Sequence, residues 1–151
     1  IGADIAGYDY KEQLKKDLAA DDRVDEVIDV GIGAGEDIDY PHVAVSGARL
    51  IAAGKADRGL FICGTGMGVA MAANKVPGIR AAYAASIELA ELAREHNDAQ
   101  IIAMGGRFTD IETGCAIADA FLATDFSGDE RHARRLAMVS RFEADGSLPE
   151  G

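Results

Sequence analysis

A cysteine followed by a glycine-rich loop is the feature of this sequence best suited to chemistry. The segment reads Cys63-Gly64-Thr65-Gly66-Met67-Gly68 and leads into a helical run of small residues. Glycines there let backbone N–H groups point inward toward an anion, and a helix start lowers the pKa of a thiol from about 8.5. Cys63 is therefore a candidate base for taking a proton from carbon. Two structural alternatives stay open: an ordinary tight turn, and a cysteine that acts only as a small buried apolar side chain.

A basic segment near the end of the chain suits an anionic ligand. It contains Arg131, His132, Arg134 and Arg135. Positions 131 and 135 are one helical turn apart, so two guanidinium groups point the same way and could hold a phosphate. The alternative is a solvated basic face that offsets the acidic residues just before it.

Two further groups could titrate or react. His96-Asn97-Asp98 offers an imidazole near neutral pH, although a lone histidine at the end of a helix is also typical of a C-terminal cap. Cys115 lies mid-helix between apolar neighbours, and we interpret it as structural.

The scaffold for these residues follows from the alternation of short β-like runs with helical runs. We predict strands at 1–5, 26–30, 59–63, 79–84 and 100–104, and helices at 10–20, 41–53, 68–75, 87–95, 110–123 and from 129 onward. Such an order predicts an α/β fold, a three-layer α/β/α sandwich with a five-stranded parallel sheet of Rossmann-like type. Ligands bind beyond the carboxyl ends of such strands, where Asp4, Cys63 and Arg107 follow strands one, three and five.

Length and charge narrow the class of protein. The 151 residues fit one domain, predicted over 1–144 with a polar tail at 145–151. A net charge of −11 opposes nucleic acid and anionic membranes, so an anionic substrate needs a local basic pocket. No apolar run approaches the ~20 residues of a membrane span, and two cysteines in a chain that needs no disulfide indicate a cytoplasmic protein. Ile1 already lies in a strand-like run, so we expect the native start to be missing.

Taken together, the motifs resemble the ribose-5-phosphate isomerase B and galactose-6-phosphate isomerase family over nearly the whole chain. Their order and spacing carry the resemblance. The motifs are Ile1-Gly2-Ala3-Asp4 with Ala6-Gly7, Asp39-Tyr40-Pro41, Ile62-Cys63-Gly64-Thr65-Gly66-Met67-Gly68, Ala72-Ala73-Asn74-Lys75-Val76-Pro77-Gly78-Ile79-Arg80, Glu95-His96-Asn97-Asp98-Ala99, and Arg131-His132 with Arg135.

The resemblance implies a homodimer that interconverts aldose and ketose phosphates without metal or organic cofactor, at sites shared between subunits; pairing of dimers into a tetramer stays open. Cys63 would shuttle the proton between carbons 2 and 1. The remaining implied roles are enediolate binding by the N–H groups of Gly64, Thr65, Gly66, Met67 and Gly68, hydroxyl binding or proton transfer by Asp4, ring opening by Thr65 and His96, substrate contacts by Asn97 and Tyr40, and phosphate binding by Arg107, Arg131 and Arg135.

The chain departs from the family pattern at two places. Ile5 stands where the family has a histidine on the phosphate side, and Ala84-Ala85-Ser86 replaces a His-Asp pair found in many relatives. Val69 occupies the position at which some members carry a glutamate base, so this chain groups with the cysteine users.

We therefore expect an isomerase with ribose 5-phosphate and ribulose 5-phosphate as the leading pair. Other tetrose, pentose or hexose phosphates stay open, as does a sugar-phosphate-binding module without catalysis. A flavodoxin-like or nucleotide-binding domain is compatible with the topology, but the GxGxxG fingerprint with a distal acid is missing.

Overall fold

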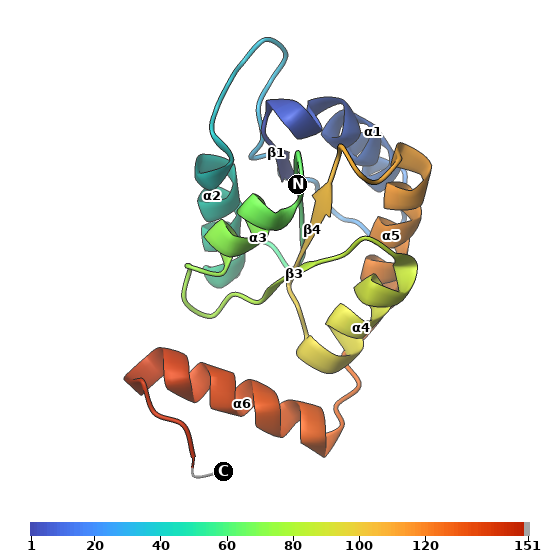
Figure 1. The fold of residues 1–151 in the computed structure, drawn as a ribbon. Helices are drawn as coiled ribbons and strands as arrows, with labels where there is room; N and C mark the ends of the chain where they lie inside the picture. The colour runs from blue at the N-terminus through green and yellow to red at the C-terminus, as the bar shows by residue number, and fades with distance from the viewer. Residues whose placement is uncertain (150–151) are drawn as a thin grey trace.

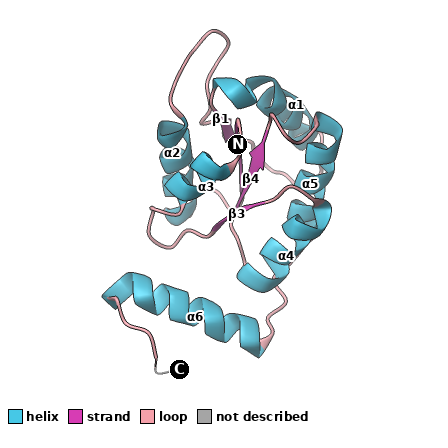
Figure 2. Ribbon diagram, viewed as in Figure 1, coloured by secondary structure: helices cyan, strands magenta, loops and turns pink. Residues whose placement is uncertain are grey.

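Parallel pairing of four short strands forms the centre of the molecule (Figure 1, Figure 2). The computed structural model describes residues 1–149. The strands are β1 (Gly2–Ala3), β2 (Gly59–Cys63), β3 (Ala81–Tyr83) and β4 (Ile101–Gly105), and they lie in the order β1-β2-β4-β3. All the pairings are parallel, so the predicted α/β fold with a parallel sheet is confirmed.

The sheet has four strands where five were predicted, because residues 26–30 do not form a strand. The segment still runs beside β1: the N–H of Val30 donates to the carbonyl of Ile1 at 2.9 Å, and the N–H of Ile32 to that of Ala3 at 3.1 Å. The neighbouring strand β1 is too short for a regular ladder with this segment, because it has only two residues before Asp4 leads the chain into the 3-10 helix η1 (Ile5–Gly7).

Helices cover both faces of the sheet, which gives the three predicted layers (Figure 1). One face carries α1 (Tyr8–Ala19), α4 (Ile87–Asn97) and α5 (Ile111–Ala123). The other carries α2 (Tyr40–Ala52) and α3 (Met67–Ala73). The two strands in the middle of the sheet are buried along their whole length, as central parallel strands require.

Alternation along β2 decides which layer each of its side chains meets. Leu60 and Ile62 belong to the core on the α1, α4 and α5 side, whereas Phe61 and Cys63 belong to the core on the α2 and α3 side. The thiol of Cys63 therefore leaves the sheet on the side where α3 begins.

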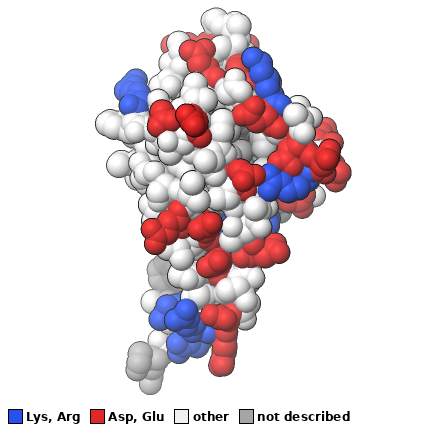
Figure 3. Space-filling view, turned by 90° about the vertical axis from the view of Figure 1, so that its right-hand side faces the viewer, with Lys and Arg blue, Asp and Glu red and all other residues white. Residues whose placement is uncertain are grey.

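The last helix, α6 (Glu130–Asp145), stands apart from this sandwich (Figure 1, red). His132 is its one buried residue, while Val139 and Phe142 are 57% and 56% exposed. Figure 3 shows basic side chains gathered at the end of the molecule where α6 lies, beside a body whose visible face carries many acidic groups. The polar tail predicted at 145–151 begins at the last residue of α6, and positions 150–151 lie outside the described residues.

Candidate active site

Cys63 lies at the carboxyl edge of the sheet, where the sequence placed it. It is the last residue of β2, is paired in register with Gly105 at the end of β4, and is 4% exposed. The backbone N–H of Gly66 donates to its Sγ at 3.2 Å. An N–H group aimed at the sulfur stabilises negative charge there, as a base of this type requires.

The turn that delivers this N–H depends on glycine. Gly66 has φ +80°, in the left-handed region, and a Cβ there would lie 2.8 Å from the backbone carbonyl carbon of Met104 and 2.9 Å from the ring of Tyr83. On the facing strand, a Cβ on Gly105 would lie 2.7 Å from the carbonyl oxygen of Thr65. The loop and the end of β4 thus approach more closely than side chains would allow.

Two predicted site residues flank the loop. The ring of Tyr40 lies over Gly68, where an added Cβ would be 2.8 Å from Cζ of the tyrosine. The guanidinium of Arg107 lies over Gly64, 3.0 Å from such an added Cβ, and the N–H of Arg107 donates to the carbonyl of Gly64 at 3.1 Å. The loop therefore sits between an aromatic ring and a cation.

The other two side chains of the loop differ in exposure: Thr65 is half-buried and Met67 is exposed. Met67 begins α3 and is 56% exposed, and its N–H donates to Oγ1 of Thr65 at 3.3 Å. This hydrogen bond fixes the threonine hydroxyl at the start of α3.

Asp4 leaves the sheet next to Cys63. It follows Ala3, which pairs with Ile62, so the aspartate and the cysteine end neighbouring parallel strands. Its Oδ1 accepts the N–H of Ala6 at 3.0 Å. Burial raises the pKa of this carboxyl, against the opposing effects of the backbone N–H groups and of Arg107. Burial therefore makes the ionised form of Asp4 less favourable in the folded protein than in water.

Four predicted site residues lie far from the Cys63 loop in the folded chain. His96 and Asn97 end α4, just before β4 begins, and Arg131 and Arg135 lie on α6. Because β4 has five residues that rise about 3.3 Å each, its two ends are separated by about 13 Å. One chain therefore brings Asp4, Tyr40, the Cys63 loop and Arg107 together, and holds the histidine and the arginine pair at the opposite edge.

Sequence reasoning missed Tyr83, whose ring contacts Gly66. It is the last residue of β3, and its position at the carboxyl end of a strand was the signal that could have identified it. Asp37 was also missed, although its charge contributes to the raised pKa of Asp4.

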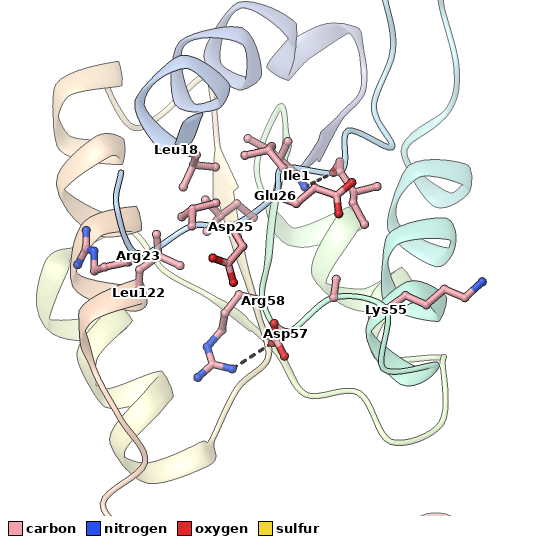
Figure 4. A pocket seen from close by; sticks show the side chains of 14 residues that line it. Ile1, Leu18, Arg23, Asp25, Glu26, Lys55, Asp57, Arg58 and Leu122 are labelled. Atoms are coloured by element: carbon pink, nitrogen blue, oxygen red, sulfur yellow. Dashed lines mark hydrogen bonds between the residues drawn. The ribbon is translucent and has the colours of Figure 1, made fainter. Parts of the chain in front are cut away.

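A hollow of about 320 Å³ lies at the amino edge of the sheet, away from Cys63 (Figure 4). Leucines 18, 60 and 122 line it together with charged residues that include Arg23, Asp25 and Arg58. It contains none of the predicted site residues. Among residues 1–149, no three His, Cys, Asp or Glu side chains come together as a metal site requires. The same part of the chain contains no helix with the length and apolarity of a membrane span.

The molecule is a parallel α/β protein with a thiol and a glycine turn at the carboxyl edge of its sheet, the edge at which such folds bind small molecules, and comparison with known proteins identifies the family. The family model described as Ribose/Galactose Isomerase matches residues 1–139. The chain belongs to this family.

Individual relatives match along nearly their whole length. The chain is 45% identical over 144 residues to D-erythrulose-4-phosphate isomerase 2 of Mycolicibacterium smegmatis, covering 95% of each protein. It is 39% identical over 150 residues to ribose-5-phosphate isomerase B of Mycobacterium tuberculosis, covering 99% of this chain and 91% of that one. Among solved structures, ribose-5-phosphate isomerase B of Clostridium thermocellum superposes with a TM-score of 0.90 at 41% identity, covering 97% of both chains.

The close approach of the loop to β4 predicts an unequal response at two glycines of similar φ. Gly66→Ala should lower the free energy of unfolding by about 1–3 kcal/mol more than Gly78→Ala, because its methyl group meets strand backbone. Gly78 is the matched control: its φ is +81°, and a Cβ there meets no atom within 4 Å. Urea unfolding of both variants measures the difference, and equal losses would contradict the tight fit.

The environment of Asp4 predicts a variant that stabilises the fold. At pH 7, Asp4→Asn should unfold at a higher urea concentration than the parent, because burial disfavours the carboxylate while the amide oxygen can still accept from Ala6. A raised pKa in the folded state means that stability is lost as the pH rises through that value. The advantage of the variant should therefore shrink as the pH falls toward about 3.9, the ordinary value for aspartate. A variant less stable than the parent at pH 7 would rule out this account.

Proposed function

We propose that this chain is an aldose-ketose isomerase of sugar phosphates in which Cys63 moves the proton. The observation that carries the proposal is the buried thiol at the end of β2, with the N–H of Gly66 on its sulfur. The family match over residues 1–139 supports it independently.

The reaction balances without an external oxidant or reductant. The thiolate of Cys63 takes the proton from carbon 2 of the open-chain aldose; the C–H electron pair forms the double bond between carbons 1 and 2, and the carbonyl pair moves to oxygen 1. The thiol then returns the proton to carbon 1, while the hydroxyl proton passes from oxygen 2 to oxygen 1. The product is the ketose, and the thiolate is regenerated.

The loop would stabilise the enediolate between these steps. The N–H of Gly66 lies on the thiol, and the neighbouring N–H groups from Gly64 to Gly68 are proposed as further donors; each such donor is commonly worth about 10²–10³ in rate. Asp4 is proposed for hydroxyl binding or proton transfer, and Thr65, together with His96, for opening of the furanose ring. Tyr40 would line the pocket and Arg107 would contribute to phosphate binding.

A second copy of the chain would complete the site. His96 and Asn97 lie before β4, at the opposite edge of the sheet from the thiol of their own chain, and Arg131 and Arg135 lie on α6, so we propose that a neighbour supplies these four residues. The exposed apolar residues of α6 suit burial against that neighbour. We infer a homodimer with two shared sites. Light scattering measures the mass of the assembly and would also show whether dimers pair into tetramers.

Two substrate pairs have support. Ribose 5-phosphate and ribulose 5-phosphate lead, because relatives at 33–41% identity with solved structures are named for that sugar. A four-carbon pair, erythrose 4-phosphate and erythrulose 4-phosphate, is the second candidate, because the 45% identical relative is named for it and Ile5 replaces a phosphate-side histidine.

Domain organisation and cellular location are part of the same proposal. Residues 1–144 would act as a single isomerase domain, followed by the polar tail. Cys63 and Cys115 are free, which supports the proposed cytoplasmic location.

Replacing the thiol tests the chemistry. Cys63→Ser should lower kcat at least 10²-fold on every accepted sugar phosphate, because a hydroxyl is a far weaker base than a thiolate. The assay covers a panel of tetrose, pentose and hexose phosphates, with Cys115→Ser as the matched control that keeps its activity. Unchanged turnover in Cys63→Ser would refute the proposed base, and tight binding without turnover in the wild type would favour a non-catalytic module.

Mixing two inactive variants tests the shared site. Cys63→Ser and Arg131→Ala/Arg135→Ala should each be inactive, yet a mixture refolded together should regain about one quarter of the wild-type activity, because each mixed dimer has one intact site. Light scattering checks the mass of the assembly. An active monomer, or a mixture with no recovery despite dimer formation, would exclude sites shared between subunits.

A further inference from the structure

Two histidines meet where α6 joins the rest of the chain. The ring centroids of His96 and His132 are 4.2 Å apart, and the ring planes are inclined by 40°. His132 is 5% exposed, whereas the residues beside it in α6 are exposed. The contact joins the end of α4 to the start of the otherwise isolated helix.

A serine fixes the ring of His132. Its Oγ lies 2.8 Å from Nδ1 of the imidazole and also accepts the N–H of Asp129 at 3.2 Å. The N–H of this serine, Ser127, donates to the carbonyl of Glu95 at 3.1 Å, which ties the segment to α4. The hydroxyl can donate its proton to Nδ1 while its oxygen accepts from Asp129, and in that arrangement His132 carries its own proton on Nε2.

The surroundings of His132 favour its neutral form. Burial lowers the pKa of this imidazole, and the proximity of His96, Arg131 and Arg135 adds to the effect, against the carboxylate of Asp129. A neutral ring in one tautomer is a rigid, uncharged support for the imidazole that packs on it.

We propose that His132 is a positioning residue for the isomerase: held by Ser127, it fixes the ring of His96 in one orientation and anchors the first turn of α6 to α4. The inference rests on the proposed function, in which His96 opens the sugar ring in a site shared with a second copy. His132 itself does not touch substrate. It sets the orientation of the His96 ring, which is proposed to open the sugar, and the position of Arg131 at the start of α6.

Sugar chemistry separates this role from a general structural one. Ribose 5-phosphate has a free hydroxyl on carbon 4 and closes to a furanose, so its isomerisation needs ring opening. Erythrose 4-phosphate has its carbon 4 oxygen esterified to phosphate, cannot form a furanose, and reaches the thiol without that step. Loosening His96 should therefore slow the first sugar and leave the second nearly unchanged.

The experiment compares Ser127→Ala and His132→Phe with His42→Phe, a matched control at an exposed position of α2. For the first two variants we expect kcat/KM for ribose 5-phosphate to fall about 10-fold or more relative to that for erythrose 4-phosphate, because a misplaced catalytic group is costly. The control should keep the wild-type ratio. An equal loss on both sugars would overturn the proposal and leave His132 with a structural role in α6.

Nuclear magnetic resonance provides a readout independent of turnover. The chain has only 3 histidines, so ¹H–¹⁵N spectra of the imidazoles resolve each one. We expect wild-type His132 to carry its proton on Nε2 at pH 7, and the ring signals of His96 to shift and broaden in Ser127→Ala. A wild-type His132 protonated on Nδ1, or unchanged His96 signals, would overturn the proposal.

The two measurements also separate this inference from failure of the proposed function. If the wild type turns over neither sugar, or only one of them, the spectra decide the role of His132. If Cys63→Ser stays active, the proposed base is wrong, and the histidine contact is still judged by the substrate ratio and the spectra. If His132→Phe does not fold, Ser127→Ala and the wild-type tautomer carry the test.

Discussion

The contact between the Cys63 loop and the end of β4 is the constraint on which the candidate site depends. A strand end offers a side chain, but a base also needs donors around it, and these come from a turn that has to press against neighbouring backbone. Gly66 and Gly105 permit that approach from opposite sides. The register of β2 with β4 brings Cys63 beside Gly105, so the pairing of the sheet and the surroundings of the thiol depend on each other.

A second constraint is the direction of the chain. In a parallel sheet, a helix that follows a strand runs back to the amino edge, and residues at the helix end arrive there too. His96 ends α4 and Cys63 ends β2, so the fold itself puts them at opposite edges. Two histidine-containing elements, α4 and α6, then meet each other and not the thiol of the same chain.

The sequence was sufficient for the parallel fold, the position of Cys63 and the proximity of Asp4, because each depends on local pattern and on the rule that strand ends share an edge. For Tyr83 the sequence offered its place at a strand end but not its contact with the loop, since the order β4-β3 is not sequential and only the folded sheet shows that this strand end lies near the loop. The segment 26–30 has strand-like composition, but regular pairing also needs a partner of matching length, which no local window reveals. His132 lies in a basic, solvent-facing pattern, and its burial results from a tertiary contact that periodicity cannot predict.

The isolation of α6 links folding to concentration. A helix of 16 residues with one buried side chain gains little from its own chain, and helical stability in proteins comes mainly from packing. If a neighbour covers its apolar side, association stabilises the folded form by mass action, so the midpoint of thermal unfolding rises with protein concentration. Under the proposed shared site, dilution would disorder α6 and leave the site incomplete at the same time, so specific activity would depend on the concentration of the enzyme.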